Sequence, residues 1–169
     1  MTTPQQLTIS LAQERRSLDF LVFKLEVQKL LLESGALWWT KETTAEIESA
    51  VSEVQSCART RQRRTAAVAS SNGLPEGAPL VAVIGVVGDP WDGILSQSCL
   101  ALSAALGGVE SFAAEHVERL VRSTAALAER GAETPPGLEV HDLEDAVGTV
   151  RLVTELCGQL SSELSAQRC

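Results

Sequence analysis

Apolar residues recur every seven positions along residues 5–34, which is the spacing of a helix that packs one side against a partner helix. Pro4 suits the start of such a helix and Gly35 suits its end. Charged residues between the apolar positions, Glu14 among them, are expected to form a solvated face. The apolar row and the positions that broaden it are Leu7, Leu11, Leu18, Leu21, Val22, Leu25, Leu30 and Leu32.

A second stripe, with alternating four- and three-residue steps, predicts a helix over residues 40–70. The run from Thr43 to Glu46 has the form of a capping box, so Thr43 is an alternative start. Asn, Gly and Pro cluster at 72–79, which predicts a loop. The stripe consists of Ile47, Val51, Val54, Ala58, Arg61, Thr65 and Val68.

Residues 80–88, LVAVIGVVG, fit either a strand or a short buried helix. Their β-branched side chains favour a strand, but a single strand has nothing to pair with, and the segments around it are helical. We therefore slightly favour a helix. Asp89 and Pro90 then suit the N-cap and first position of a long helix that continues to Arg130.

Two heptad rows support this long helix over nearly five repeats. Gly107 and Gly108 interrupt its middle, weaken it by about 1 kcal/mol per glycine and mark a candidate kink. The first row is Leu95, Leu102, Val109, His116 and Ser123. The second row is Cys99, Leu106, Ala113, Leu120 and Leu127.

The remainder predicts a linker at 131–137 and an amphipathic helix from about residue 140 to 166 whose apolar stripe drifts. We interpret this helix as marginal and flexibly tethered. The domains predicted are a helical domain at 1–131 and a linker with a C-terminal tail at 132–169. The fold class is all-α, an elongated antiparallel bundle or coiled coil of three long helices, a short helix and this last one.

Composition narrows the possible functions. The chain has 169 residues, a net charge of −8, 4% aromatic residues and no tyrosine. Few aromatics and an acidic balance argue against nucleic-acid binding. Residues 1–71 hold 9 Lys+Arg and 8 Asp+Glu, whereas residues 72–169 hold 5 and 14. No secretion signal or membrane-spanning segment is visible, so we expect a cytoplasmic protein without membrane insertion.

A search for catalytic or metal-binding patterns finds little. Gly85 and Gly88 give only a GxxG pattern, short of a nucleotide-binding fingerprint. His116 lies in a heptad row and is interpreted as a polar break in a helical seam, while His141 is expected to face solvent. The cysteines form no CxxC pair, which favours reduced thiols. We therefore expect no enzyme activity, no cofactor and no metal.

The scarce aromatic residues and one basic cluster need an explanation. Trp38, Trp39 and Trp91 are expected to plug the ends of a helical bundle, with a substrate pocket as the alternative. The arginines within residues 59–64 are expected to suit the end of the second helix and to pair with the acidic helix that follows. Phe112 is a candidate contact for a partner helix.

The order of elements resembles the FlgN family of flagellar export chaperones. The stretch from Phe23 to Trp39, FKLEVQKLLLESGALWW, is followed by TTAEIE at 43–48. The family has a phenylalanine-lysine-leucine-glutamate start, a leucine run, a glycine, a tryptophan and an alanine- and threonine-rich turn into an acidic helix. Pro90 and Trp91 fit the same family. The resemblance covers roughly residues 7–130.

This resemblance implies a cytoplasmic, mostly helical chaperone without catalytic residues. It would bind the C-terminal helical regions of hook-associated proteins of the FlgK and FlgL type, prevent premature assembly and deliver them to the flagellar type III export apparatus. The alternative is a generic coiled-coil adaptor or oligomerisation module.

Candidate partner-binding residues come from the apolar stripes of the later helices. Aspartate at Val109 and Phe112 is expected to weaken partner binding and to leave helicity intact. The candidates are Leu102, Leu106, Val109, Phe112, Leu120, Leu127, Leu143, Val147 and Val150.

Overall fold

The computed structural model describes residues 3–130 and 137–166 of the chain. Within these two ranges all regular structure is helical, which confirms the predicted all-α, elongated fold. The elements are α1 (Pro4–Glu33), η1 (Leu37–Trp39, a 3-10 turn), α2 (Thr40–Ser71), α3 (Leu80–Val87), α4 (Trp91–Arg130) and α5 (Val140–Ala166).

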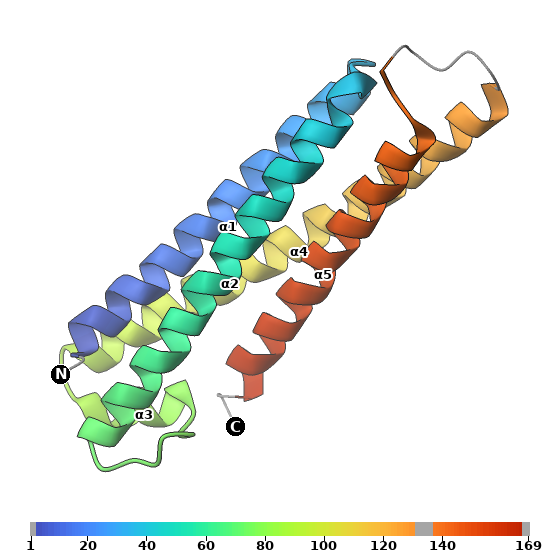
Figure 1. Cartoon of the computed structure of the whole chain (residues 1–169). Helices are drawn as coiled ribbons and strands as arrows, with labels where there is room; N and C mark the ends of the chain where they lie inside the picture. Colours follow the sequence, from blue (N-terminus) through green and yellow to red (C-terminus); the bar gives the residue numbers. More distant parts are fainter. Residues whose placement is uncertain (1–2, 131–136, 167–169) are drawn as a thin grey trace.

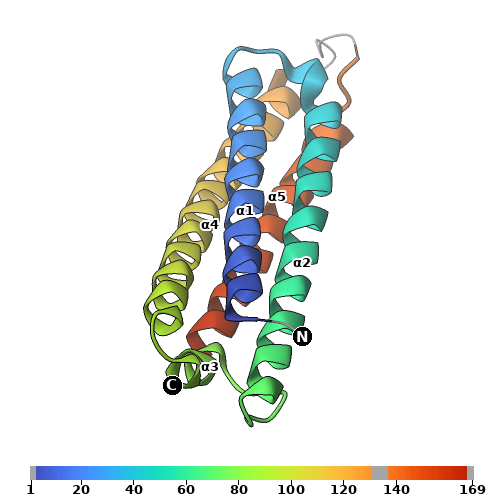
Figure 2. The ribbon, with the colours of Figure 1, turned by 90° about the vertical axis from the view of Figure 1, so that its left-hand side faces the viewer.

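The long helices of the described chain run alternately up and down, as in an antiparallel helical bundle (Figure 1). α1 packs against α2 and α4, and α5 packs against α4 and α2. Figure 2 shows α1 between α4 and α2, with α5 behind them. Short α3 closes one end of the bundle, near the start of α1 and the end of α5, and η1 lies at the other end.

The ends of α1 follow from local chemistry. Thr3 and Gln6 form a capping box, in which the Thr3 hydroxyl accepts from the Gln6 backbone N–H and the Gln6 side chain accepts from Thr3 N–H. Pro4 occupies the first turn, as predicted. Gly35 ends the helix at φ 78°, a left-handed conformation that glycine adopts without strain.

The core is a continuous apolar seam along the bundle axis. Seven of the heptad-row positions of α4, namely Leu95, Leu102, Leu106, Val109, Ala113, Leu120 and Leu127, are buried apolar residues. In α1, Leu7, Leu11, Leu18, Leu21 and Leu25 are at most 1% exposed. One predicted member of this seam is wrong, because Leu30 is 61% exposed.

The predicted start of α2 at Thr40 is confirmed, and the alternative start at Thr43 is wrong, because the Thr43 hydroxyl donates to the Trp39 carbonyl one turn back instead of capping the helix. The predicted start of α4 is corrected. Helix α4 begins at Trp91, so Asp89 and Pro90 lie in the preceding turn rather than at the N-cap and first position. The favoured helix at 80–88 is confirmed as α3.

Helix α5 belongs to the bundle. It contributes buried side chains to the same core as α1, α2 and α4 rather than lying apart from them as a loose tether. These side chains are Leu143, Ala146, Val150, Val153, Cys157, Leu160 and Leu164. Helix α4 continues without a break through Gly107 and Gly108. Most of the predicted linker, residues 131–136, lies outside the described residues.

Candidate functional site

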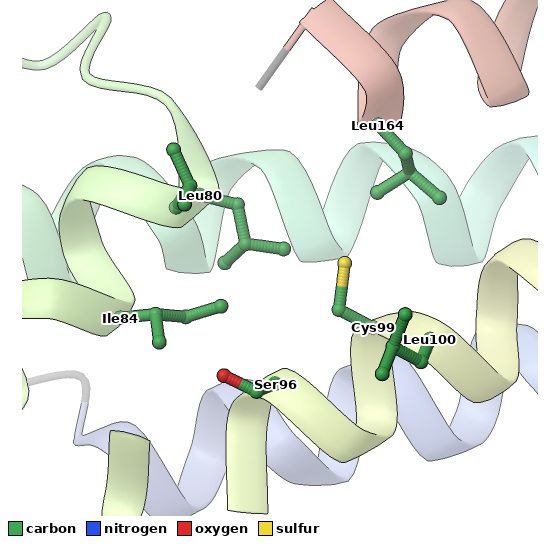
Figure 3. Close-up of a pocket in the computed structure, with 7 residues that line it drawn as sticks. Leu80, Ile84, Ser96, Cys99, Leu100 and Leu164 are labelled. Carbon is green, nitrogen blue, oxygen red and sulfur yellow. The ribbon is translucent and has the colours of Figure 1, made fainter. Parts of the chain in front are cut away.

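An apolar pocket opens at the α3 end of the bundle, where α3, the first third of α4 and the end of α5 meet (Figure 3). It has a volume of about 200 Å³. Small-molecule sites usually measure roughly 300–1,000 Å³, so this pocket is better suited to one or two apolar side chains of a partner. Its lining residues are Leu80, Val81, Ile84, Ser96, Cys99, Leu100 and Leu164.

The rim of this pocket carries large apolar side chains that the bundle leaves uncovered. Leu100 is 61% exposed and Val81 is 41% exposed, although both line the pocket. Val86 of α3 and Ile94 of α4 are also exposed but lie outside the pocket lining. Apolar side chains gathered around an open pocket are typical of protein-interaction surfaces.

The segment of α3 and early α4 that lines most of the pocket is sparsely charged, and its charges are of one sign. Residues 65–118 contain no Lys or Arg, so every formal charge in this stretch is negative. Helix α3 carries no charged side chain at all. Arginines of the neighbouring helices lie at the same end, since Arg64 of α2 donates to the Gln6 carbonyl at the start of α1. The acidic residues of the stretch are Glu76, Asp89, Asp92, Glu110, Glu115 and Glu118.

The partner-binding residues predicted from the apolar stripes lie inside the bundle. Phe112 and Val147 are half-buried and pack against the core. The other candidates are at most 5% exposed: Leu102, Leu106, Val109, Leu120, Leu127, Leu143 and Val150. Aspartate at Val109 would thus place a charge in the core, so a binding test requires surface positions such as Leu100.

Two other expectations are corrected by the packing. Trp38 and Trp39 do not plug the bundle, because both are about half exposed, at 51% and 49%. The arginine cluster does not pair with α4. Instead, Arg61 contacts Glu14 of α1 and Glu163 of α5, and Arg64 donates to the Gln6 carbonyl of α1.

A charged pair lies in the core between α1 and α2. The Arg61 Nε donates to Glu14 Oε2 at 2.6 Å, and the Arg61 Nη2 donates to Glu14 Oε1 at 3.4 Å. Neither side chain is exposed to solvent. Glu163 of α5 approaches the same guanidinium at 4.0 Å. Burial raises the pKa of the Glu14 carboxyl despite its arginine partner.

A second buried polar network joins α1, α2 and α4. The Gln28 amide nitrogen donates to the hydroxyls of Thr43 and Thr44 at 3.1 and 3.0 Å. Its Oε1 lies 2.9 Å from His116 Nε2. Burial, together with the charges of Arg119 and Lys29, lowers the pKa of His116 to about 4.

The sequence did not lead us to expect that these polar residues pair in the core, although their positions within the apolar rows indicated that they are buried. Glu14 and Gln28 continue the spacing of the buried α1 leucines in steps of three and four, and Arg61 is itself a member of the α2 stripe. A polar residue at a seam position has to find a partner in the core. Both clusters connect helices, and neither lines the apolar pocket at the α3 end, so we assign them to the scaffold.

In residues 3–130 and 137–166, no group of three or more His, Cys, Asp or Glu is placed to hold a metal ion. In the same ranges, no helix combines the length and apolar character needed to cross a bilayer. His141 is exposed, as predicted, and lies 3.2 Å from Asp145.

The fold and the site together define an antiparallel helical bundle with an uncovered apolar pocket at one end. Neither a family model, nor a curated protein, nor a solved structure matches the chain.

Proposed function

We propose that this bundle is a helical chaperone of the FlgN type, which binds hook-associated flagellar proteins in the cytoplasm and keeps them unassembled until export. The observation that carries the proposal is the apolar pocket between α3, α4 and α5, with the exposed side chains of Leu100 and Val81 at its rim. An amphipathic helix of a partner would insert apolar side chains there, as in helix-in-groove recognition.

The FlgN-like sequence motif supports the same proposal through its position. Residues 23–48 form the second half of α1, the η1 turn and the start of α2, which together build the end of the bundle opposite α3. Lys24 and Glu46, both in the motif, form a salt bridge of 2.8 Å between the two helices. The motif thus accounts for the helical hairpin, while the pocket at the other end supplies the binding surface.

The alternative is a generic coiled-coil adaptor or oligomerisation module. The leucine row of α1 that would seal such an oligomer is largely used inside the bundle, where Leu11, Leu18 and Leu25 are at most 1% exposed. An adaptor would therefore have to assemble through other surfaces. A constitutive dimer or tetramer in light scattering, without affinity for a hook-associated protein, would favour this alternative.

The replacement of Leu100 by serine is expected to weaken the complex with a hook-associated protein's C-terminal helical region by at least about tenfold. The reason is that burial of a leucine side chain contributes about 1.5–3 kcal/mol. Isothermal titration calorimetry with the full chain measures the affinity. Because Leu100 is 61% exposed in the free chain, helicity by circular dichroism should not change.

Val121→Ser is the matched control, because Val121 is also an exposed apolar residue of α4 but lies outside the pocket lining. It should bind like the unmodified chain. If the unmodified chain binds neither a FlgK-type nor a FlgL-type hook-associated protein, the proposed function is wrong. If it binds but both serine variants match it, the partner uses a surface other than the pocket.

A further inference from the structure

Helix α1 carries a second apolar series on its outer side. The inner series, which fills the core, runs from Leu7 through Leu25 in steps of four and three. Starting two residues later, the same steps pick out another row, about 200° around the helix from the first. We call it the outer seam; it consists of Ile9, Gln13, Arg16, Phe20, Phe23, Val27, Leu30 and Ser34.

Within the bundle the middle of the outer seam is uncovered. Phe20 is 51% exposed, Phe23 53% and Leu30 61%. The two phenylalanine rings lie 6.4 Å apart, and the Lys24 ammonium sits 5.1 Å from one centroid and 5.7 Å from the other. Lys24 is held in turn by Glu46 of α2. The aromatic pair is therefore fixed in place before any partner arrives, which reduces the entropy cost of binding.

The flanks of the outer seam carry an asymmetric charge pattern. On the side facing α4, an acidic residue recurs every seven positions, at Asp19, Glu26 and Glu33, and all three are exposed. Asp19 marks this side, because it lines a groove together with Ser98 and Ala101 of α4, to which Arg15 and Arg16 of α1 also contribute. On the side facing α2, Lys24 is already neutralised by Glu46. Of the acidic row, Glu33 pairs with Lys29 one turn back at 3.8 Å, an exposed ion pair that a partner's cation can replace.

We propose that the outer seam of α1 docks an amphipathic helix of a partner protein, whose apolar stripe packs on Phe20, Phe23 and Leu30 and whose Lys or Arg residues face Asp19, Glu26 and Glu33. Seven-residue spacing on both the apolar and the acidic row fits a helix laid along α1 in coiled-coil geometry. In such pairs, charges beside the seam select the partner and its orientation.

A second copy of this chain complements the surface poorly. In an antiparallel pair of α1 helices, the acidic rows of both copies would meet and repel. In a parallel pair, the acidic row would face Ser17, Lys24 and Leu31, which offer a single cation that Glu46 already engages. A basic partner helix places cations opposite all three acidic residues, where Lys29 reaches Glu33 from within the chain. Phe20, Phe23 and Leu30 line no part of the pocket, so this inference stands independently of the proposed function.

Two synthetic helices test the proposal. Both are 21-residue, fluorescein-labelled peptides with leucine at every core position of the heptad; one has lysine and the other has glutamate in the flanking rows. Fluorescence anisotropy with the full chain at low salt should show the lysine peptide binding at least about fivefold more tightly, since each helix charge pair contributes a few tenths of a kcal/mol.

Two variants and a matched control separate this site from general attraction to an acidic protein. Phe20→Ser with Phe23→Ser should weaken the lysine peptide by roughly tenfold, because two aromatic contacts are lost. Asp19→Lys with Glu26→Lys and Glu33→Lys should invert the preference toward the glutamate peptide. The control, Glu42→Lys with Glu118→Lys and Glu129→Lys, changes the net charge equally at exposed positions elsewhere and should keep the preference for lysine.

The proposal is overturned if the lysine peptide does not bind. It is also overturned if the control loses its preference for the lysine peptide as fully as the variant with lysine at Asp19, Glu26 and Glu33 does. It is also overturned if the serine variant binds like the unmodified chain. Dimerisation in light scattering that the serine variant abolishes would make a second copy the occupant instead of a partner. Leu100→Ser, which alters only the pocket, should leave peptide binding unchanged and so keeps the two surfaces distinguishable.

Discussion

Replacement of Arg61 by alanine is expected to lower the free energy of unfolding by about 3–5 kcal/mol, a large part of the stability of a domain of this size. The guanidinium holds Glu14 through two hydrogen bonds, at 2.6 and 3.4 Å, in a site where neither side chain is exposed. The alanine variant would leave the Glu14 carboxylate buried without its counter-charge. Urea denaturation followed by circular dichroism measures the loss.

The same pair explains why a double replacement should behave differently. Burial already raises the pKa of Glu14 although Arg61 opposes this, so the pair as a whole offsets its desolvation cost only in part. Arg61→Met combined with Glu14→Leu removes both charges and fills the space with apolar atoms. We expect this double variant to recover most of the stability that Arg61→Ala loses.

Arg63→Ala is the control for Arg61→Ala, because Arg63 is an exposed arginine two residues further along the same helix. It should change the free energy of unfolding by less than about 0.5 kcal/mol. A loss below about 1 kcal/mol in Arg61→Ala would show that the pair does not hold α1 and α2 together. A double variant as unstable as the single one would show that packing, rather than an uncompensated charge, causes the loss.

The helices were predictable because their signals are local. Leu11, Leu18 and Leu25 mark the inner face of α1 by spacing alone, and Gly35 marks its end through a backbone conformation that glycine adopts without strain. The N-terminus of α4 was less predictable, and at α2 the alternative start at Thr43 was wrong although the start at Thr40 was predicted. Thr43 has the composition of a cap, yet its hydroxyl takes part in the buried network with Gln28 instead. Tertiary contacts there override the local preference.

The polar core was not predictable, because each of its partners is distant in sequence. Glu14 was assigned to a solvated face, but its partner Arg61 lies 47 residues away. Gln28 and His116 are 88 residues apart. The positions of these residues in the apolar rows show that the side chains are buried. They do not show which residues form hydrogen bonds or ion pairs with them. The pairing depends on how four helices align, and that alignment is a property of the whole bundle.

The residues predicted to bind a partner and the apolar residues that the bundle leaves uncovered are different residues. Stripes on α4 and α5 were assigned to a partner, whereas Val109 and Val150 fill the core. The uncovered apolar residues lie elsewhere, at Leu100 and along the outer side of α1. A heptad pattern shows that a face is apolar, but whether the chain itself covers that face depends on the number of helices available. Here α5 covers the inner stripe of α4.

A pH-dependent loss of stability is expected at His116 and can be derived from its hydrogen bonds. Both Gln28 amide protons are used on the hydroxyls of Thr43 and Thr44, and Thr44 in turn donates to the Thr40 carbonyl. Gln28 Oε1 can therefore only accept, so His116 Nε2 carries the proton. The other ring nitrogen, Nδ1, is buried without a partner. Protonation would place a second N–H there with nothing to accept it.

The sign of the effect follows from the two pKa values. Burial and the nearby cations Arg119 and Lys29 lower the pKa of His116 in the folded chain to about 4, whereas the unfolded value is 6.5. The unfolded chain therefore binds the extra proton between these values. The stability due to the neutral imidazole is complete above pH 6.5 and is lost as the pH falls toward 4. At 1.36 kcal/mol per pKa unit, the full loss is roughly 3 kcal/mol.

Because carboxylates titrate in the same range, the effect is isolated by comparison with His116→Gln, which can still donate to Gln28 Oε1 but cannot become charged. The variant should lie within about 1 kcal/mol of the unmodified chain at pH 7.5. Between pH 7.5 and pH 4.5, the free energy of unfolding of the unmodified chain should fall by roughly 2–3 kcal/mol more than that of His116→Gln. Urea denaturation at both pH values measures this difference. His141→Gln, at an exposed site, should show no such crossover. Parallel pH profiles for the unmodified chain and His116→Gln would contradict the buried, neutral imidazole and with it the proton assignment in the Gln28 network.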